Sequence, residues 1–246
     1  MSDAGSPQAS DARFPTTHWS RVVRAGDRST RAAREALAEL CASYWYPVYA
    51  FIRRQGHEPD QAQDLTQAFF VHLLEKGTLA TADPSRGKFR SFVRTACAHF
   101  LADERDRARA RKRGGDQIVL SIDARDAEGR YLREPAHNLT PDRLFERTWV
   151  LTVLEHVFER LSQEYEKAGQ AALFELLKSV LTDGPHSVSY ATIAARLGMT
   201  AGAVQVAVHR LRTRYRAILL DEIAATLDDP AGVEDEVQEL FAVLSG

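Results

Sequence analysis

The stretch YATIAARLGMTAGAVQVAVHRLRTRYR, residues 190–216, decides the fold of the second half of the chain. Gly198 stands at a break between two helical runs, where the backbone turns with positive φ, a conformation that glycine tolerates best. The hydroxyl of Thr200 can then cap a second helix that begins at Ala201. Ala194 is small at the point where the two helices cross closely. This spacing predicts a helix-turn-helix, although an ordinary helical hairpin would share it.

The charge of the second helix favours the DNA-binding alternative. Residues 201–216 contain one histidine and four arginines and no Asp or Glu. Such a helix suits the major groove of DNA, with its first turns near the base edges and its arginines near the phosphates. The candidate DNA contacts are Thr200, Ala201, Gln205, His209, Arg210, Arg212 and Arg214.

Charge is segregated along the rest of the chain, although the formal net charge is only −2. Residues 86–113 hold ten Lys or Arg and three Asp or Glu, and residues 186–216 hold five Arg and no acid. Residues 221–246 hold eight acids and no Lys or Arg. Two basic blocks and an acidic tail are typical of a polyanion binder with a separate protein-facing or self-shielding end.

The first basic block mixes aromatic and basic residues. It opens with Lys88-Phe89-Arg90-Ser91-Phe92, and His99-Phe100 follow on the same predicted helix, residues 88–113. A basic surface with aromatic faces suits single-stranded nucleic acid, because bases stack on rings while cations follow the phosphates. Taken singly, each phenylalanine fits the hydrophobic core better, so the core alternative stays open for these rings.

Several function classes find no support in the sequence. No apolar run reaches the length of a membrane span, and the first 13 residues lack the apolar region of a signal peptide, so we expect a cytoplasmic protein. Neither cysteine, Cys41 nor Cys97, lies in a metal-binding pattern, and both are expected to be buried on helices. Catalytic and nucleotide-binding motifs are also missing, so we expect neither an enzyme nor a cofactor.

Helical periodicity predicts an all-α fold of two small domains joined by a flexible linker. Within the first domain, Pro47 should end or kink one helix, and the next should run from Asp60 to Lys76 and stop at Gly77. The predicted segments are a disordered N-terminus (1–14), a first domain (15–113), the linker (114–141), a second domain (142–220) and an acidic tail (221–246). The tail should form one amphipathic helix after Pro230.

Three motifs together resemble the extracytoplasmic-function (ECF) sigma factors over about residues 15–220. AQDLTQAFF, residues 62–70, resembles the helix that docks on the clamp helices of the largest subunit of RNA polymerase. KFRSF, residues 88–92, through DER, residues 103–105, resembles the segment that opens and binds the −10 promoter element. The segment 190–212 resembles the helix-turn-helix that binds the −35 element.

The resemblance implies core RNA polymerase and promoter DNA as partners, and it assigns roles to residues of the first domain. The loop 77–87 would capture an unpaired −10 base, and Phe89 and Phe92 would stack on or wedge between bases. The implied polymerase-docking residues are Asp60, Asp64, Gln67 and Phe70. The implied −10 contacts are Arg86, Lys88, Phe89, Arg90, Phe92, His99, Arg105 and Arg109.

The chain departs from the family pattern at positions that affect docking and promoter choice. Gln63 and Ala68 stand where acids are usual, Ala98-His99 replace Arg-Asn, and Gln205-Val206-Ala207 replace a more basic run. Phosphorylation of Thr66 would add negative charge to the docking helix, so a Ser/Thr kinase could regulate docking in place of an anti-sigma protein.

Two alternatives compete with the sigma-factor interpretation. A stand-alone helix-turn-helix repressor would bind duplex DNA at a symmetric site without polymerase. A helical metal-dependent hydrolase would have to use His72, His99 or Asp103, and no spacing supports it. Association with core polymerase would separate the three.

Overall fold

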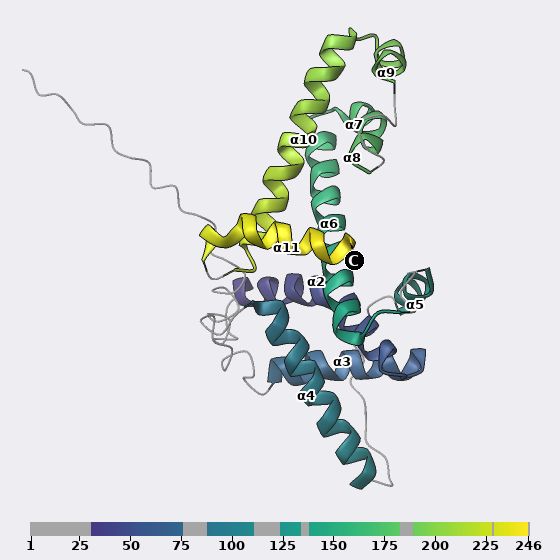
Figure 1. Cartoon of the computed structure of the whole chain (residues 1–246), viewed down its shortest axis with the longest axis vertical. Coiled ribbons are helices and arrows are strands. Elements are labelled where there is room, and N and C mark those ends of the chain that lie inside the picture. Colours follow the sequence, from purple (N-terminus) through teal and green to yellow (C-terminus); the bar gives the residue numbers. More distant parts are fainter. Residues whose placement is uncertain are drawn as a thin grey trace, which may run out of the picture.

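The computed structural model describes residues 31–75, 88–110, 124–133, 138–182, 189–227 and 229–245, and its regular structure in these ranges is entirely helical (Figure 1). The all-α prediction is therefore confirmed. The first part comprises α2 (Arg31–Arg54), α3 (Pro59–Glu75), α4 (Phe89–Ala110) and α5 (Ala124–Arg133). The second comprises α6 (Pro141–Lys167), α7 (Ala171–Leu177), α8 (Ser179–Thr182), α9 (Tyr190–Leu197), α10 (Ala201–Ala224), a 3₁₀ turn (Pro230–Gly232) and α11 (Val233–Ser245).

The sequence predicted that a helix ends or kinks at Pro47, and α2 does not end there but continues to Arg54. A proline inside a helix removes one backbone hydrogen bond and costs about 3 kcal/mol. The neighbours Tyr46, Val48 and Tyr49 are each at most 5% exposed, and their burial offsets that cost. Tertiary packing thus overrides the local preference of the sequence.

Helix α6 connects the two ends of the molecule (Figure 1). Thr140 caps it with its hydroxyl, which accepts from the backbone N–H of Arg143 at 3.3 Å. In its first half Trp149 stacks on Tyr44 of α2, with ring centroids 6.2 Å apart. In its second half Phe158 packs on Phe174 of α7 at 5.3 Å. The buried residues form one continuous core, and the predicted second domain, 142–220, begins at the first turn of α6, a helix that packs on both halves.

Helix α5 lies inside the segment that the sequence predicted to be a structureless linker. Glu128 accepts hydrogen bonds from the Arg53 Nε at 3.0 Å, the Arg53 Nη2 at 2.9 Å and the Tyr49 hydroxyl at 2.5 Å. Arg130 lies over the ring of Tyr46, 4.0 Å from its centroid, and pairs with Glu155 of α6 at 2.8 Å. Polar contacts hold this helix, which explains why apolar periodicity did not predict it. The rest of the predicted linker, residues 114–123 and 134–137, lies outside the described ranges, which resume at residue 138.

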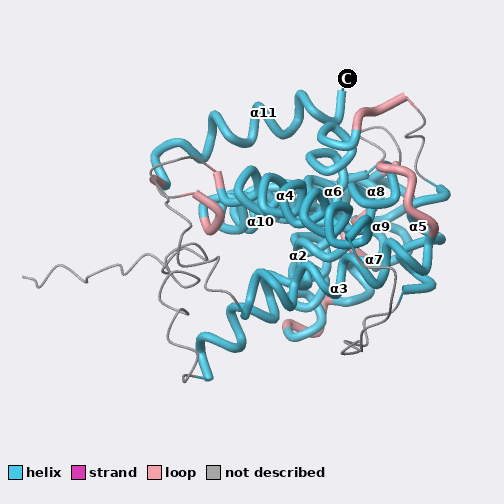
Figure 2. Tube along the Cα trace, turned by 90° about the horizontal axis from the view of Figure 1, so that it is seen from below, coloured by secondary structure: helices cyan, strands magenta, loops and turns pink. Residues whose placement is uncertain are grey.

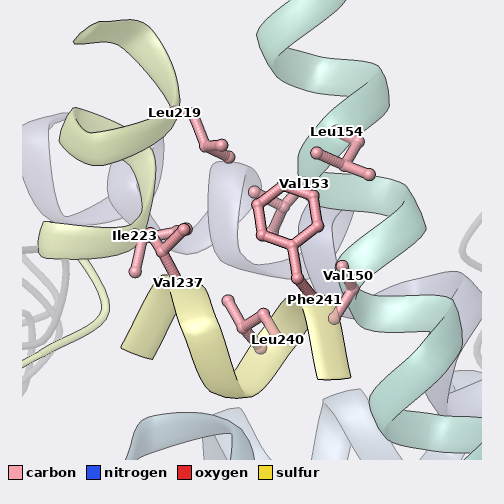
Figure 3. A pocket seen from close by; sticks show the side chains of 8 residues that line it. All are labelled: Val150, Val153, Leu154, Leu219, Ile223, Val237, Leu240 and Phe241. Atoms are coloured by element: carbon pink, nitrogen blue, oxygen red, sulfur yellow. The ribbon is translucent and has the colours of Figure 1, made fainter. Parts of the chain in front are cut away.

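The amphipathic helix predicted in the tail is present as α11, and it forms an outer layer along one side of the bundle (Figure 2). Its apolar face is directed at α6 and α10 (Figure 3). The space left among these side chains is about 10 Å³, room for no more than one water molecule. The residues that line it are Val150, Val153, Leu154, Leu219, Ile223, Val237, Leu240 and Phe241.

Candidate nucleic-acid interface

Helices α9 and α10 have the geometry of a helix-turn-helix. They are bent by 104° across a short break, within the range of about 90–120° typical of the motif. Gly198 has a φ of 63°, and the Thr200 hydroxyl accepts from the backbone N–H of Ala203 at 3.2 Å, so both predicted turn residues act as expected. Ile193 of α9 and Val204 of α10 are buried between the helices.

No single helix among the described residues is long and apolar enough to span a membrane. Taken together, α9 and α10 have the length and the apolar composition of a membrane span, but they form a bent pair. Val208 and Leu211 in that pair are at most 3% exposed inside the protein, so we assign its apolar residues to core packing.

The outer face of α10 presents polar and basic side chains to solvent. His209, Arg210 and Arg212 are exposed, and none of them forms a salt bridge with another described residue. Gln205 is also exposed, as is the apolar side chain of Val206, which is 50% exposed. Gln can pair with adenine, and an apolar group can contact the thymine methyl, so this face combines cations with base-reading chemistry.

The last two arginines of the motif are engaged within the protein. Arg214 donates two hydrogen bonds to the carboxylate of Glu164 on α6, both at 2.6 Å. These hydrogen bonds hold the pKa of Glu164 below its ordinary value. Arg216 pairs in the same way with Glu234 of α11, at 2.7 and 2.9 Å. Arg214, predicted as a DNA contact, therefore also ties α10 to α6.

The aromatic residues at the start of α4 face the interior to different degrees. Phe89 is 3% exposed and meets the ring of Tyr44 edge-on at 5.5 Å. Phe92 is partly buried, with its ring centroid 5.8 Å from that of Phe89. In this conformation Phe89 belongs to the core, the alternative that the sequence left open, and its ring is not available to stack on a base.

The basic residues beside them are paired with carboxylates. Arg90 is 6% exposed, donates to Glu146 of α6 at 2.6 Å and also pairs with Glu236 of α11. Its guanidinium carbon lies 5.0 Å from the ring centroid of Trp149. Lys88 pairs with Glu236 at 2.5 Å and with Glu239. Sequence reasoning missed these carboxylates, although the negative charge of the acidic tail was a signal for Glu236 and Glu239.

Further along α4 two predicted −10 contacts are exposed. His99 faces solvent, and Arg105 is exposed while it donates to the side-chain oxygen of Gln55 at 2.6 Å. Arg86 and the loop 77–87 lie outside the described residues, and so does the side chain of Arg109. The structure thus leaves the middle of α4 open and covers its beginning.

Helix α3 presents only part of the predicted polymerase-docking set. Asp60 and Asp64 are exposed on its surface, whereas Gln67 is 8% exposed and Phe70 1%. Phe70 stacks on Trp45 of α2, with ring centroids 5.8 Å apart. The acids can meet a basic partner, but Phe70 is a core residue.

Thr66 is fully buried, and its hydroxyl donates to the backbone carbonyl of Ala62 at 2.7 Å. A kinase cannot reach that oxygen in this conformation, so the structure counts against the predicted phosphorylation site. The sequence could have predicted the burial of Thr66, because it lies at helical spacing from Ala62, Phe69 and Leu73, which form the buried face of α3.

The described residues contain no group of three or more His, Cys, Asp or Glu side chains that could hold a metal ion. Cys97 is buried as predicted, and burial raises the pKa of its thiol. His72, considered for a hydrolase, packs against Phe100 with ring centroids 5.3 Å apart.

Comparison with known proteins identifies the family. A family model described as "ECF sigma factor" matches residues 17–221, which include all of α3, α4, α6 and α9 and most of α10. Searches among curated proteins and among solved structures gave no match. The matched region contains both basic helices and excludes α11. Because it covers well over half of the 246 residues, the chain belongs to the ECF sigma factor family.

Proposed function

We propose that this sigma factor, which directs RNA polymerase to promoters, contacts the −35 element through α10 and the −10 element through α4. The observation that carries the proposal is the exposed face of α10, where His209, Arg210 and Arg212 stand beside Gln205 and form no salt bridge within the part of the chain that the structure describes. A helix of this kind places its first turns at base edges and its cations at phosphates.

The middle of α4 is the best candidate for the −10 contacts. His99 and Arg105 are exposed on one helix, away from the buried residues Val93 and Cys97. An aromatic imidazole and a guanidinium can stack on unpaired bases and bind phosphates. The first turn of α4 would add Lys88 and Arg90 once these two cations are released from their carboxylates.

Docking on the polymerase clamp helices would rest on Asp60 and Asp64, the exposed acids of α3. Neither DNA contact needs to be tight alone, because attachment to polymerase raises the effective concentration of each helix on the promoter. The site of action would be the cytoplasm, with core polymerase and promoter DNA as partners. The family consists of non-enzymatic regulators, so the proposal assigns no catalytic residue.

Transcription from a randomised promoter library by core polymerase plus this protein tests the proposal. We expect two enriched sequence blocks at a fixed separation. Gln205→Ala should relax the choice of base in the upstream block only, and His99→Ala should change the downstream block only. The assignment of α10 to the −35 element and α4 to the −10 element would be refuted if Gln205→Ala changed the downstream block and His99→Ala the upstream block. It would also be refuted if neither variant changed either block.

The family match does not favour a stand-alone repressor. Selection from the same promoter library distinguishes a repressor from a sigma factor. A repressor would bind duplex DNA without core polymerase and select a symmetric site. Enrichment of a palindrome in the absence of polymerase would support that alternative.

A further inference from the structure

Helix α11 pairs with cations of both α4 and α10, the two helices of the proposed promoter interface. Glu236 and Glu239 engage Lys88, and Glu236 also engages Arg90, all at the start of α4. Two residues earlier on the same helix, Glu234 pairs with Arg216 of α10. Three of the eight acids of the tail are thus paired with cations of α4 and α10.

The contact with Arg90 is the deepest of these. Glu236 is 2% exposed although it carries a carboxylate, and its two partners are Lys88 and Arg90, at the start of α4. A buried carboxylate is stable only when it is paired and hydrogen-bonded. Its oxygens therefore occupy the positions around Lys88 and Arg90 where an anion of DNA would otherwise bind.

Apolar contacts also hold the helix. Leu240 is buried, and Val233, Val237 and Leu244 pack against the core, whereas Phe241 is still 48% exposed. The last turn adds one hydrogen bond, from Arg147 to the backbone carbonyl of Leu244 at 3.2 Å. Because α11 lies as an outer layer, its removal would leave the other helices connected to one another (Figure 2).

We infer that α11 is an intramolecular competitor of promoter DNA: its carboxylates occupy Lys88 and Arg90 in the free protein, and DNA phosphates replace them in the open promoter complex. The inference rests on the proposed −10 role of α4. No bond is made or broken in the exchange, and the released helix carries its negative charge away from the DNA.

Hydrogen exchange of the backbone amides of Val233–Ser245 tests directly whether α11 is displaced when DNA binds. The free protein and its polymerase complex on a promoter are compared, and permanganate reactivity of unpaired thymines shows whether the promoter is open. We expect α11 to be protected in the free protein and to exchange at least about ten-fold faster in the open complex, as a helix without packing partners does.

A charge variant gives the second arm. Glu236→Gln/Glu239→Gln should raise the affinity of the full-length free protein for a single-stranded −10 oligonucleotide by roughly three- to ten-fold. The control Glu166→Gln/Asp235→Asn removes the same charge from two exposed positions that form no salt bridge with another described residue, and it should change affinity less than about two-fold.

The outcomes separate the two proposals. An open promoter with α11 still protected overturns the competitor but leaves the proposed function intact. A promoter that never opens overturns the −10 assignment and the inference with it. If the charge variant does not fold, the exchange measurement on the unaltered protein decides alone.

Discussion

Helices α4 and α10 are both basic in sequence, yet the cations at the start of α4 are paired, whereas two of the four arginines of α10 are not paired with any described carboxylate. On α10, Arg210 and Arg212 are exposed with no described carboxylate paired to them. On α4, Lys88 and Arg90 are held by acids of α6 and α11 that lie far away in the chain. A basic run in the sequence therefore shows where cations are, but not whether they are free to bind DNA, because that depends on which acids the fold brings to them.

The largest expected effect concerns the aromatic start of α4. Phe89→Ala should lower the free energy of unfolding by about 3–5 kcal/mol, because it leaves a cavity against Tyr44 in the core. Urea denaturation measures the loss. Phe92→Ala, at a partly buried position, should cost clearly less. If both variants lost little free energy of unfolding, and by equal amounts, the rings of Phe89 and Phe92 would be accessible to a ligand. The start of α4 would then differ less from the exposed face of α10.

The next effect concerns the buried cation of α4. Arg90→Met should cost about 3 kcal/mol, since Glu146 and Glu236 lose a buried partner. Adding Glu236→Leu should recover part of that loss, because the second change removes the uncompensated carboxylate.

The matched control for Arg90 is Arg94→Met. Arg94 is 30% exposed and lies 3.4 Å from Asp142, so its loss should cost less than about 1 kcal/mol. Equal stability of the two single variants in thermal unfolding would contradict the claim that Arg90 is engaged more deeply than its neighbour.

A smaller effect is expected on α10, where it appears in binding rather than stability. Arg210→Ala/Arg212→Ala should lower the promoter affinity of the polymerase complex about ten-fold or more and reduce the slope of log K against log salt by about 2, one for each lost phosphate contact. Arg214→Ala is the control, because that guanidinium is already bound to Glu164. Identical slopes for both variants would show that exposure on α10 does not predict DNA contact.

The smallest effect concerns the attachment of α5. Hydrogen bonds from Arg53 hold the pKa of Glu128 below its ordinary value. A depressed pKa in the folded state stabilises the protein above the unfolded pKa of about 4.3, and that stability is lost as the pH falls through the lower folded value. Glu128→Gln should therefore cost about 1 kcal/mol at pH 7 and flatten the stability profile below pH 5. The control Glu166→Gln, at an exposed position that forms no salt bridge with another described residue, should cost clearly less at pH 7.

The helix-turn-helix was predictable because its signals are local. Gly198 fixes the turn and Thr200 the start of α10, and both act within a few residues of the backbone groups that they position. The tail helix was predictable in the same way from its apolar spacing.

The pairing of charges was not predictable, because it is a property of the assembled fold. Nothing in the sequence near Arg90 indicates that its partner is Glu236, 146 residues away. The burial of Thr66 is a different case. The helical repeat of buried residues predicts that Thr66 is buried, but the prediction of a phosphorylation site relied on the acids of the docking helix instead.

Helix α6 has a consequence for promoter geometry. It is 27 residues long, about 40 Å, which equals the rise of roughly 12 base pairs of DNA at 3.4 Å each. Trp149 packs this helix on α2, and Arg214 of α10 binds Glu164 near its other end, so in this conformation the distance between α4 and α10 depends on α6 rather than on a chain that can stretch. If α4 and α10 contact the two promoter elements as proposed, this helix would set the spacing between the elements, and a promoter with one added base pair would have to twist or bend to match it.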